Sequence, residues 1–477
     1  MTVPAMPRLD PELFRRQAHQ VADWMADYLR DVSRYPVQPS VLPGEIRAQL
    51  PERPPAEAEE FTRIMADFER IIMPGMTHWG HPGFFGYFPA NTSPPSILAE
   101  MLTAALGAQC MSWSTSPAAT ELEQVTLGWL RRMLGLPEGF TGVIQDTAST
   151  ATLIAFITAR DQALGRASGR AVGELTAYTS EEANFSVTKG ARLAGFLPER
   201  IRLIETDAQA AMKVDALEAT IAADRAAGLS PCCVVSTVGT TGSTAIDPVP
   251  AIAEVCRREK LWLHVDAAFA GSAAILPEMR WLLDGAEAAD SLVVNPHKWL
   301  LVNFDCSAYF VRDPATLLRS FAASAEILKS VYDGTGVNFR DWGIQLGRRF
   351  RALKLWFVIR TYGVEGLQAM IREHIRLGHL FASWVEAEPG FELAGPARLA
   401  TVCFRRVSGG NGPALDPDAL NQDLLRRLNA SGKVFLTGTR LNGRYVLRLS
   451  LGHLTTTQAH VREVWEMIRQ GARELGS

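Results

Sequence analysis

A lysine lies directly after an apolar run that has the composition of a buried strand. The stretch "VVNPHKWLLVNFDC" (293–306) opens with two valines, turns through Asn295 and Pro296, and reaches Lys298 in apolar surroundings. A lysine in a turn is ordinarily solvated. A desolvated lysine has a lowered pKa and can act as an amine nucleophile or form a Schiff base. The residues that follow the other apolar runs help to decide between a solvated lysine and a reactive one.

A carboxylate and two segments rich in hydroxyl groups also follow apolar runs. Asp266 in "WLHVDAAFAG" either caps a helix or faces a positive group, because a buried carboxylate without a cationic partner is costly. The segment "QDTASTATL" (145–153) opens a helical pattern, and helix N-termini bind phosphate, although an ordinary capped helix has the same pattern. A second such loop is "STVGTTGSTAIDP" (236–248). Pyridoxal phosphate requires an amine, a carboxylate and a phosphate-binding helix terminus, and the segments described so far contain all three. The residues by themselves are equally compatible with a solvated lysine, a helix-capping carboxylate and an ordinary capped helix.

Strand and helix patterns alternate around these residues. Runs dense in Val and Leu at 232–239, 261–268 and 291–298 indicate strands, and 245–260 indicates a turn and a helix between two of them. Continuous apolar strands that alternate with helices predict an α/β fold with a mainly parallel sheet covered on both faces. Ligands bind at the carboxyl ends of such strands, where Lys298 and Asp266 would lie.

The two ends of the chain have different patterns. Residues 11–35 have helical spacing with one apolar stripe, and proline-rich connectors follow at 34–46 and 50–60. A long helix pattern begins at "GRRFRALKLWFVIRTYG" (347–363). Beyond it, "ARLATVCFRR" and "GRYVLRLSLG" indicate antiparallel strands of a smaller α+β domain.

Composition argues against several classes of function. The 477 residues include 48 basic and 51 acidic side chains, and a formal net charge of -3 gives no electrostatic case for nucleic acid or an anionic membrane. No apolar run approaches the length of a transmembrane helix, and the N-terminal residues lack the apolar segment of a secretory signal. The six cysteines form no CxxC pair, so we expect a cytoplasmic protein without a disulfide framework or a metal site.

Several motifs together resemble the group II pyridoxal-phosphate-dependent decarboxylases, and within them the aromatic-L-amino-acid decarboxylases. They are "HWGHPGFFGYFP", "SWSTSPAATELE", "GVIQDTAS", "HVDAAFAGSA", "NPHKW" and "LGRRFRALKLWFVIRTYG", and the resemblance runs from near residue 10 to near residue 470. It implies a fold type I enzyme, similar to aspartate aminotransferase, that binds pyridoxal 5'-phosphate as a homodimer with the active site at the interface. The implied divisions are an N-terminal helical dimerisation segment (1–85), a large cofactor-binding domain (86–365) and a small C-terminal domain (366–477).

The resemblance also implies roles for individual residues. Lys298 matches the lysine that forms the Schiff base with the cofactor, and Asp266 matches the carboxylate that keeps the pyridine nitrogen protonated. The other cofactor positions are Ala148, Ser149, Asn295 and His297 at the phosphate, and Thr241 and Ala268 at the ring. The substrate positions are Trp79, Tyr87, Phe88 and Pro89 around the aromatic side chain, Arg448 near the carboxylate, and Gly347, whose small size permits an indole.

Two positions depart from the family pattern. The histidine that stacks on the cofactor ring is replaced by Asn184, whose amide cannot take up or donate a proton as imidazole does. The loop tyrosine that is assigned to protonating the substrate carbon falls on Ile327 in an ungapped comparison, and Tyr332 lies five positions further on. A carbanion that is not protonated promptly is open to attack by dioxygen.

These departures leave two catalytic readings. The first is decarboxylation of an aromatic L-amino acid of the phenylalanine, tyrosine, dihydroxyphenylalanine and tryptophan class, which gives the arylalkylamine and carbon dioxide. The second is a bifunctional aromatic aldehyde synthase, which couples decarboxylation to oxidative deamination and releases aldehyde, ammonia and hydrogen peroxide. A third reading, a non-catalytic relative that keeps the fold as a binding protein, is opposed by the retained Lys298, Asp266 and His297.

Overall fold

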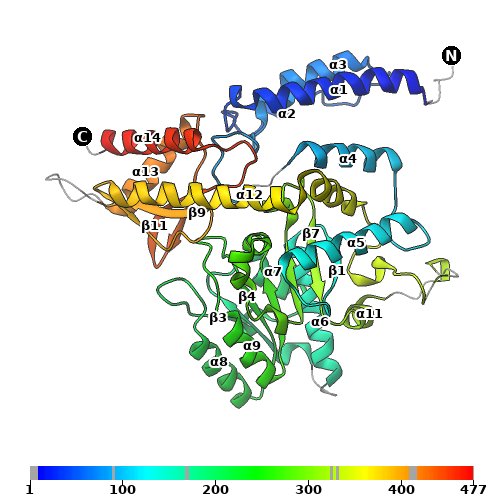
Figure 1. Cartoon of the computed structure of the whole chain (residues 1–477), viewed down its shortest axis with the longest axis vertical. Coiled ribbons are helices and arrows are strands. Elements are labelled where there is room, and N and C mark those ends of the chain that lie inside the picture. Colours follow the sequence, from blue (N-terminus) through cyan, green and yellow to red (C-terminus); the bar gives the residue numbers. More distant parts are fainter. Residues whose placement is uncertain are drawn as a thin grey trace.

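A seven-stranded sheet forms the centre of the molecule (Figure 1). The computed structural model of the chain describes residues 9–88, 92–166, 171–322, 326–328, 332, 334–407 and 416–475. The strands of the central sheet run in the order β1-β7-β6-β5-β4-β2-β3. Their bounds are β1 (Thr141–Gln145), β2 (Leu175–Ser180), β3 (Ile201–Ile204), β4 (Ser230–Thr237), β5 (Trp262–Asp266), β6 (Ser291–Val294) and β7 (Ser307–Val311).

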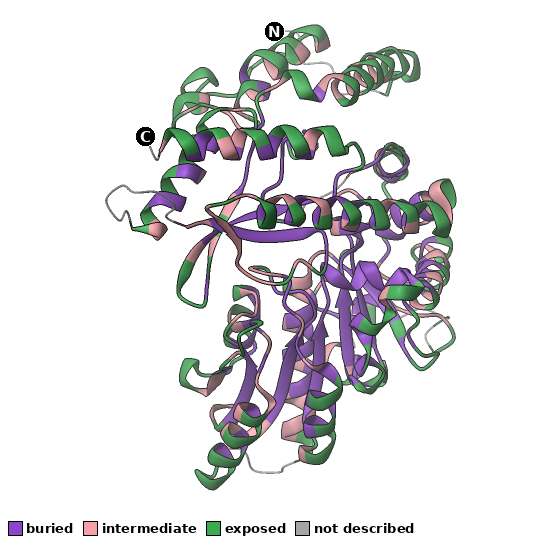
Figure 2. Cartoon of the chain, turned by 60° about the vertical axis from the view of Figure 1, so that its left-hand side comes forward, coloured by how far each residue is buried: buried purple, intermediate pink, exposed green. Residues whose placement is uncertain are grey.

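The central sheet is mainly parallel, as predicted from the alternating strand and helix patterns. Strands β3, β2, β4, β5 and β6 pair in parallel, and β7 alone runs antiparallel to its neighbours β6 and β1. Every residue of β2, β5, β6 and β7 is buried, which explains why none of these strands alternates between apolar residues and charged, solvent-facing ones. Figure 2 shows the strands as a buried layer between helices whose outer faces are exposed.

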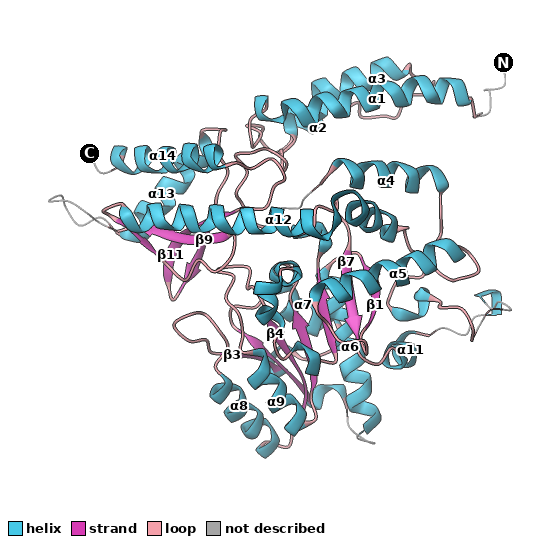
Figure 3. Cartoon of the chain, viewed as in Figure 1, coloured by secondary structure: helices cyan, strands magenta, loops and turns pink. Residues whose placement is uncertain are grey.

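Helices cover the central sheet and frame the rest of the chain (Figure 3). Pro94, Pro117 and Pro296 each begin a helix, where proline costs no hydrogen bond. The α-helices are α1 (Pro11–Asp31), α2 (Glu45–Gln49), α3 (Phe61–Asp67), α4 (Pro94–Leu106), α5 (Pro117–Leu134), α6 (Ala148–Arg166), α7 (Phe185–Leu193), α8 (Val214–Ala226), α9 (Val249–Glu259), α10 (Pro296–Trp299), α11 (Ala315–Phe321), α12 (Arg351–Ala387), α13 (Pro417–Ala430) and α14 (Gln458–Glu474).

A second sheet follows α12 and is antiparallel throughout, in the order β10-β11-β9-β8. Its strands are β8 (Phe391–Leu393), β9 (Thr401–Arg406), β10 (Thr437–Leu441) and β11 (Arg444–Ser450). The predicted antiparallel strands of the smaller α+β part are β9 and β11. The helix α12 crosses the predicted domain boundary at 365/366, and its one non-helical residue is Gly363, with φ 66° and ψ 170°. The division into domains stays a prediction.

The N-terminal helices lie apart from the rest of the molecule (Figures 1 and 2). Helix α1 occupies the region where helical spacing was predicted, and none of its residues is buried in the single chain. The apolar side chains of Leu13 and Phe14 are exposed on it. No helix in the described ranges is both long and apolar enough to cross a bilayer.

An ion pair with both side chains buried fixes β1, which leads into α6. Arg348 Nη2 lies 2.7 Å from Glu123 Oε1 and donates to the backbone carbonyl of Ile144 at 2.8 Å. The same carboxylate oxygen accepts from the Ile144 N–H at 2.8 Å. Because the charges of Arg348 and Glu123 satisfy each other and the strand backbone, β1 and the start of α6 are held in one position.

Candidate active site

A cavity of about 270 Å³ opens where the central strands and several helices meet. Strand β5 contributes Asp266 at its last position, and the short helix α10 that follows β6 contributes His297 and Lys298. The start of α6 and the start of α7 also reach it. The lining residues are Phe88, Thr147, Ala148, Ser149, Asn184, Phe185, Ser186, Thr237, Gly239, Thr241, Asp266, Ala268, Phe269, Asn295, His297, Lys298 and Phe304.

The sheet register explains why Lys298 and Asp266 meet. Strands β5 and β6 are parallel neighbours, and Asp266 is paired with Val293. The Asn295 N–H donates to the backbone carbonyl of Ala268 at 3.0 Å, which keeps the two chain segments together beyond the strands. Helix α10 then turns the chain back, so that the amine of Lys298 faces the cavity that Asp266 also lines.

Burial acts on the pKa of both charged groups. Burial raises the pKa of Asp266. Two groups oppose that rise: the positive charge of Lys298, and the Ala268 N–H, which donates to Oδ1 at 3.1 Å. Burial lowers the pKa of Lys298, and the charge of Asp266 opposes the change. A lysine with a lowered pKa has more of the free amine form that attacks carbonyl carbon.

His297 is a neutral hydrogen-bond donor. Its Nδ1 accepts from the Cys306 N–H at 2.9 Å, so the ring proton is on Nε2. The pKa of His297 is lowered to about 3, mainly by burial and to a smaller extent by the nearby charge of Lys298. Asn295 is also oriented by a hydrogen bond, because its Oδ1 accepts from the hydroxyl of Ser307. The hydrogens on Nδ2 are then available to a ligand.

The donor set of the cavity fits pyridoxal phosphate. The first turn of α6 contributes backbone N–H groups and the hydroxyl of Ser149, and a helix terminus of this kind favours an anion. Thr237 Oγ1 also lines the cavity and has no hydrogen-bond partner among the described atoms. A phosphate at these donors, a pyridine nitrogen at Asp266 and an aldehyde carbon at Lys298 would satisfy each group.

Asn184 is fixed by hydrogen bonds on both sides of its amide. As the N-cap of α7 it accepts from the Ser186 N–H at 2.9 Å through Oδ1. Its Nδ2 donates to Thr241 Oγ1, also at 2.9 Å. The cavity wall therefore has at this position an amide that neither gains nor loses a proton.

Arg448 lies behind the cavity wall and connects it to the aromatic segment 79–88. Its guanidinium carbon is 4.5 Å from the ring centroid of Phe88, its Nε donates to the carbonyl of Gly242 at 3.1 Å, and its Nη1 donates to the carbonyl of Tyr87. Burial lowers the pKa of Arg448 to about 10, so it remains a cation at neutral pH. Its Nη2 is buried without a partner in the described part of the chain. On the same segment Trp79 stacks on Tyr87, with centroids 5.6 Å apart.

The structure brings most of the predicted site residues together but not all of them. Tyr332 packs its ring against Trp113, with centroids 4.5 Å apart, and does not line the cavity. Gly347 lies beside Gln109, since a Cβ at Gly347 would be 3.2 Å from Gln109 Nε2. Trp79, Tyr87 and Arg448 also lie outside the lining set. Pro89 lies outside the described residues, as does the side chain of Ile327, whose backbone forms the 3-10 helix η9 (Glu326–Leu328).

Sequence reasoning assigned no role to Phe269 or Phe304, which line the cavity, and it included Thr237 and Gly239 only as members of the hydroxyl-rich loop 236–248. Thr237 ends strand β4, so its place at a strand end was a signal that could have found it. Phe269 follows Asp266 closely in the chain. No local pattern marks Phe304, whose ring contacts His297 at a centroid distance of 4.8 Å.

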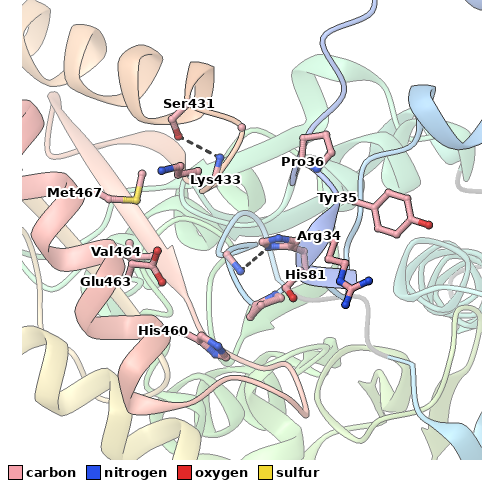
Figure 4. Close-up of a pocket in the computed structure, with 14 residues that line it drawn as sticks. Arg34, Tyr35, Pro36, His81, Ser431, Lys433, His460, Glu463, Val464 and Met467 are labelled. Atoms are coloured by element: carbon pink, nitrogen blue, oxygen red, sulfur yellow. Dashed lines mark hydrogen bonds between the residues drawn. The ribbon is translucent and has the colours of Figure 1, made fainter. Parts of the chain in front are cut away.

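A larger cavity, of about 470 Å³, lies elsewhere and has different chemistry (Figure 4). It is lined by Arg34, His81, Lys433, His460 and Glu463, among others, from the segment after α1, the segment before Phe84, the turn after α13 and the face of α14. His81 Nδ1 accepts from the Gly83 N–H at 2.8 Å and is occupied in holding its own turn. No strand of the central sheet ends there, and the lysine, carboxylate and helix terminus described above are absent from its lining.

Comparison with known proteins agrees with the chemistry of the smaller cavity. Residues 43–407 match the sequence profile of the pyridoxal-dependent decarboxylase conserved domain. The chain belongs to the pyridoxal-dependent decarboxylase family. It is therefore a carboxy-lyase that uses pyridoxal phosphate, and the expected fold type I architecture is confirmed.

Three members of the pyridoxal-dependent decarboxylase family show the range of this similarity. The aromatic-L-amino-acid decarboxylase of Sus scrofa is 44% identical over 480 residues, which cover 97% of this chain and 96% of the relative. The phenylacetaldehyde synthase of Arabidopsis thaliana is 41% identical, with 98% of this chain and 97% of the relative covered. The crystal structure of Oryza sativa TDC with PLP and tryptamine superposes with a TM-score of 0.97 at 39% identity, covering 99% of this chain and 100% of that one.

Replacing Asp266 tests the role of the buried carboxylate in this decarboxylase. Asp266→Asn keeps the shape of the side chain but removes the charge that would face a protonated pyridine nitrogen. We expect kcat to fall about 100-fold or more while Lys298 still holds the cofactor. Steady-state kinetics and the cofactor content of the denatured protein measure both quantities.

A matched control is Asp224→Asn. Asp224 is a buried carboxylate that accepts from the hydroxyl of Tyr178 at 2.8 Å and pairs with Arg202, away from the cavity. We expect this variant to lose stability but keep its kcat. Equal losses of kcat in the two variants would contradict the assignment of Asp266.

Proposed function

We propose that the protein decarboxylates aromatic L-amino acids and releases carbon dioxide and the arylalkylamine. The observation that carries this proposal is the aromatic segment 79–88, which is held against the cavity by Arg448. Phe88 presents its ring to the cavity, and Trp79 and Tyr87 stack on each other further along the segment. Flat apolar faces of this kind bind an aromatic side chain through burial and offset stacking.

The polar groups suit the other end of an amino-acid substrate. The buried cation Arg448 has a donor, Nη2, without a partner among the described residues, and a carboxylate is the ligand that such a donor prefers. The ring of Phe88 lies close to both cations: the Arg448 guanidinium carbon is 4.5 Å and Lys298 Nζ is 5.1 Å from its centroid. We infer that this apolar face keeps water from the bond between Cα and the carboxylate.

Bound pyridoxal phosphate supplies an electron sink for the pair left when carbon dioxide departs. Asp266 would hold a positive charge on the pyridine nitrogen, and the α6 terminus, Ser149 and His297 would hold the phosphate. Among the titratable groups in the described lining, Asp266 is a carboxylate and His297 is neutral with a pKa of about 3. We infer that Lys298 Nζ returns the proton to the substrate carbon.

A second function is favoured by one observation, the amide of Asn184 at the cavity wall. This amide, which is hydrogen-bonded to Thr241 and Ser186, is not an acid at neutral pH and has no proton for transfer. Tyr332, the nearest tyrosine to the position of the family's loop acid, lies against Trp113 outside the cavity lining. Slow protonation of the carbanion would favour reaction with dioxygen. One amino acid, one dioxygen and one water then give one each of aldehyde, carbon dioxide, ammonia and hydrogen peroxide.

We further propose that the active unit is a homodimer. Helix α1 has an apolar stripe but no buried residue in the single chain, and Trp79 and Tyr87 are also exposed. Apolar faces of this size are ordinarily covered by another protein surface. A partner subunit that covers α1 would also cover the aromatic segment 79–88. In that dimer, Gly347 would affect substrate choice, and the loop with Ile327 and Tyr332 would affect closure of the site.

The product branch is decided by one assay in air. The purified holoenzyme is incubated with phenylalanine, tyrosine, dihydroxyphenylalanine or tryptophan, and amine, aldehyde, peroxide and oxygen uptake are measured. We expect amine and carbon dioxide in equal amounts without oxygen uptake, because Lys298 can protonate the substrate carbon. Aldehyde and peroxide in amounts equal to carbon dioxide would replace the first function by the second, and no reaction with any of the four would contradict both.

Asn184→His restores an imidazole at the cavity wall. Where the product assay detects aldehyde, we expect this variant to raise the ratio of amine to aldehyde by about tenfold or more, because imidazole can deliver a proton and the amide cannot. The matched control is Asn184→Gln, which keeps an amide and is expected to leave the ratio unchanged. An equal ratio in the histidine variant and the original protein would remove Asn184 from the branch point.

A further inference from the structure

Three aromatic rings stack in a column from the cavity wall into the core. The ring of Phe88 lies 3.9 Å from that of Phe269, at an interplanar angle of 9°. Phe269 stacks in turn on Trp299 at 4.5 Å and 7°. Phe88 and Phe269 line the cavity, whereas Trp299 is fully buried and directly follows Lys298 in the chain. The column therefore reaches Lys298 twice, through its chain neighbour Trp299 and through the Phe88 ring, whose centroid is 5.1 Å from Nζ.

His374 on α12 holds the buried end of this column in its plane. Trp299 Nε1 donates to His374 Nδ1 at 3.0 Å, and the two rings are within 12° of coplanarity. His374 Nε2 donates to the backbone carbonyl of His453 at 3.0 Å. These two bonds fix one tautomer, and burial lowers the pKa of His374 to about 4, so the ring is neutral. Both ring nitrogens of His374 are thus hydrogen-bonded, Nδ1 to Trp299 and Nε2 to His453.

The contacts then return to the cavity wall. The ring of His453 makes an edge-to-face contact with the ring of Phe84, with centroids 5.9 Å apart. Phe84 lies in the same aromatic segment as Phe88, four residues earlier. The segment 84–88 is therefore held at one end by the column and at the other by His453, and both attachments meet at His374.

We propose that His374 is a positioning residue for the reaction, which sets the Lys298 amine and the Phe88 ring through Trp299. His374 itself does not line the cavity. Its effect is carried by Trp299, since rotation of the indole would displace Phe269 and with it the chain segment that includes Ala268 and Asp266. The inference rests on Lys298 as the cofactor-bearing lysine, and it does not depend on which amino acid is the substrate.

The test compares His374→Phe, His374→Gln and Trp299→Phe in the holoenzyme. Phenylalanine at 374 fills the space but removes both hydrogen bonds. Glutamine restores an acceptor and a donor on either side of one carbon, as imidazole has them. Trp299→Phe keeps a ring in the column and removes the N–H donor together with part of the indole's volume. The readouts are kcat, KM and the visible circular dichroism of the bound cofactor, which reports how the cofactor is oriented by its surroundings.

We expect His374→Phe and Trp299→Phe to lower kcat about 10- to 100-fold with KM little changed, and to weaken the circular dichroism band. His374→Gln should recover most of both signals. The double variant Trp299→Phe/His374→Phe should be no worse than His374→Phe by itself, because the bond lost in Trp299→Phe is already absent there. If His374→Phe does not fold, Trp299→Phe and His374→Gln still give the comparison.

The matched control is Phe381→Leu on the same helix. Phe381 is fully buried, but it packs on Phe404 and Trp465, at centroid distances of 5.2 and 5.5 Å, beside the second sheet. We expect it to lower the unfolding temperature without changing kcat or the circular dichroism band.

Wild-type kcat and circular dichroism in Trp299→Phe, or a glutamine variant no better than His374→Phe, would overturn the proposal. Loss of the band in Lys298→Ala confirms the underlying lysine assignment, and its persistence would overturn that assignment instead.

Discussion

The buried pair of charges formed by Lys298 and Asp266 is the interaction on which the site depends. Each group by itself would be costly to bury, and each opposes the pKa shift that burial imposes on the other. The pair exists because β5 and β6 are parallel neighbours in register, with Asp266 opposite Val293. The fold thus places an amine and a carboxylate at one edge of the sheet, and a cofactor with a positive nitrogen fits the space they line.

A second set of buried charges holds the segment that orients His297. Lys354 on α12 donates from Nζ to the backbone carbonyls of Asn303 and Asp305, both at 3.1 Å. Arg351 pairs with the Asp305 carboxylate through two hydrogen bonds. The next residue is Cys306, whose N–H fixes the tautomer of His297. Helix α12 therefore supports the cavity twice, once through this segment and once through His374.

Sequence predicted what is encoded locally, and packing determined the rest. Lys298 and Asp266 were predictable because each follows an apolar strand, and the parallel order of the strands follows from the helices between them. Asn184 was found only through the family resemblance, as a departure from it. Phe304 and His374 carry no local signal, because their roles arise from contacts between elements far apart in the chain. The aromatic substrate positions Trp79 and Tyr87 stay predictions for the same reason, since a partner surface would complete them.

The account's central claim is that Lys298 is the amine that holds the cofactor. Borohydride reduction of the holoenzyme, followed by proteolysis and mass spectrometry, tests it most directly. We predict a pyridoxyl group on the peptide that includes Lys298, and none on that peptide in Lys298→Ala. A modification confined to another lysine, such as Lys433 in the larger cavity, or a variant that still binds the cofactor covalently, would contradict the account.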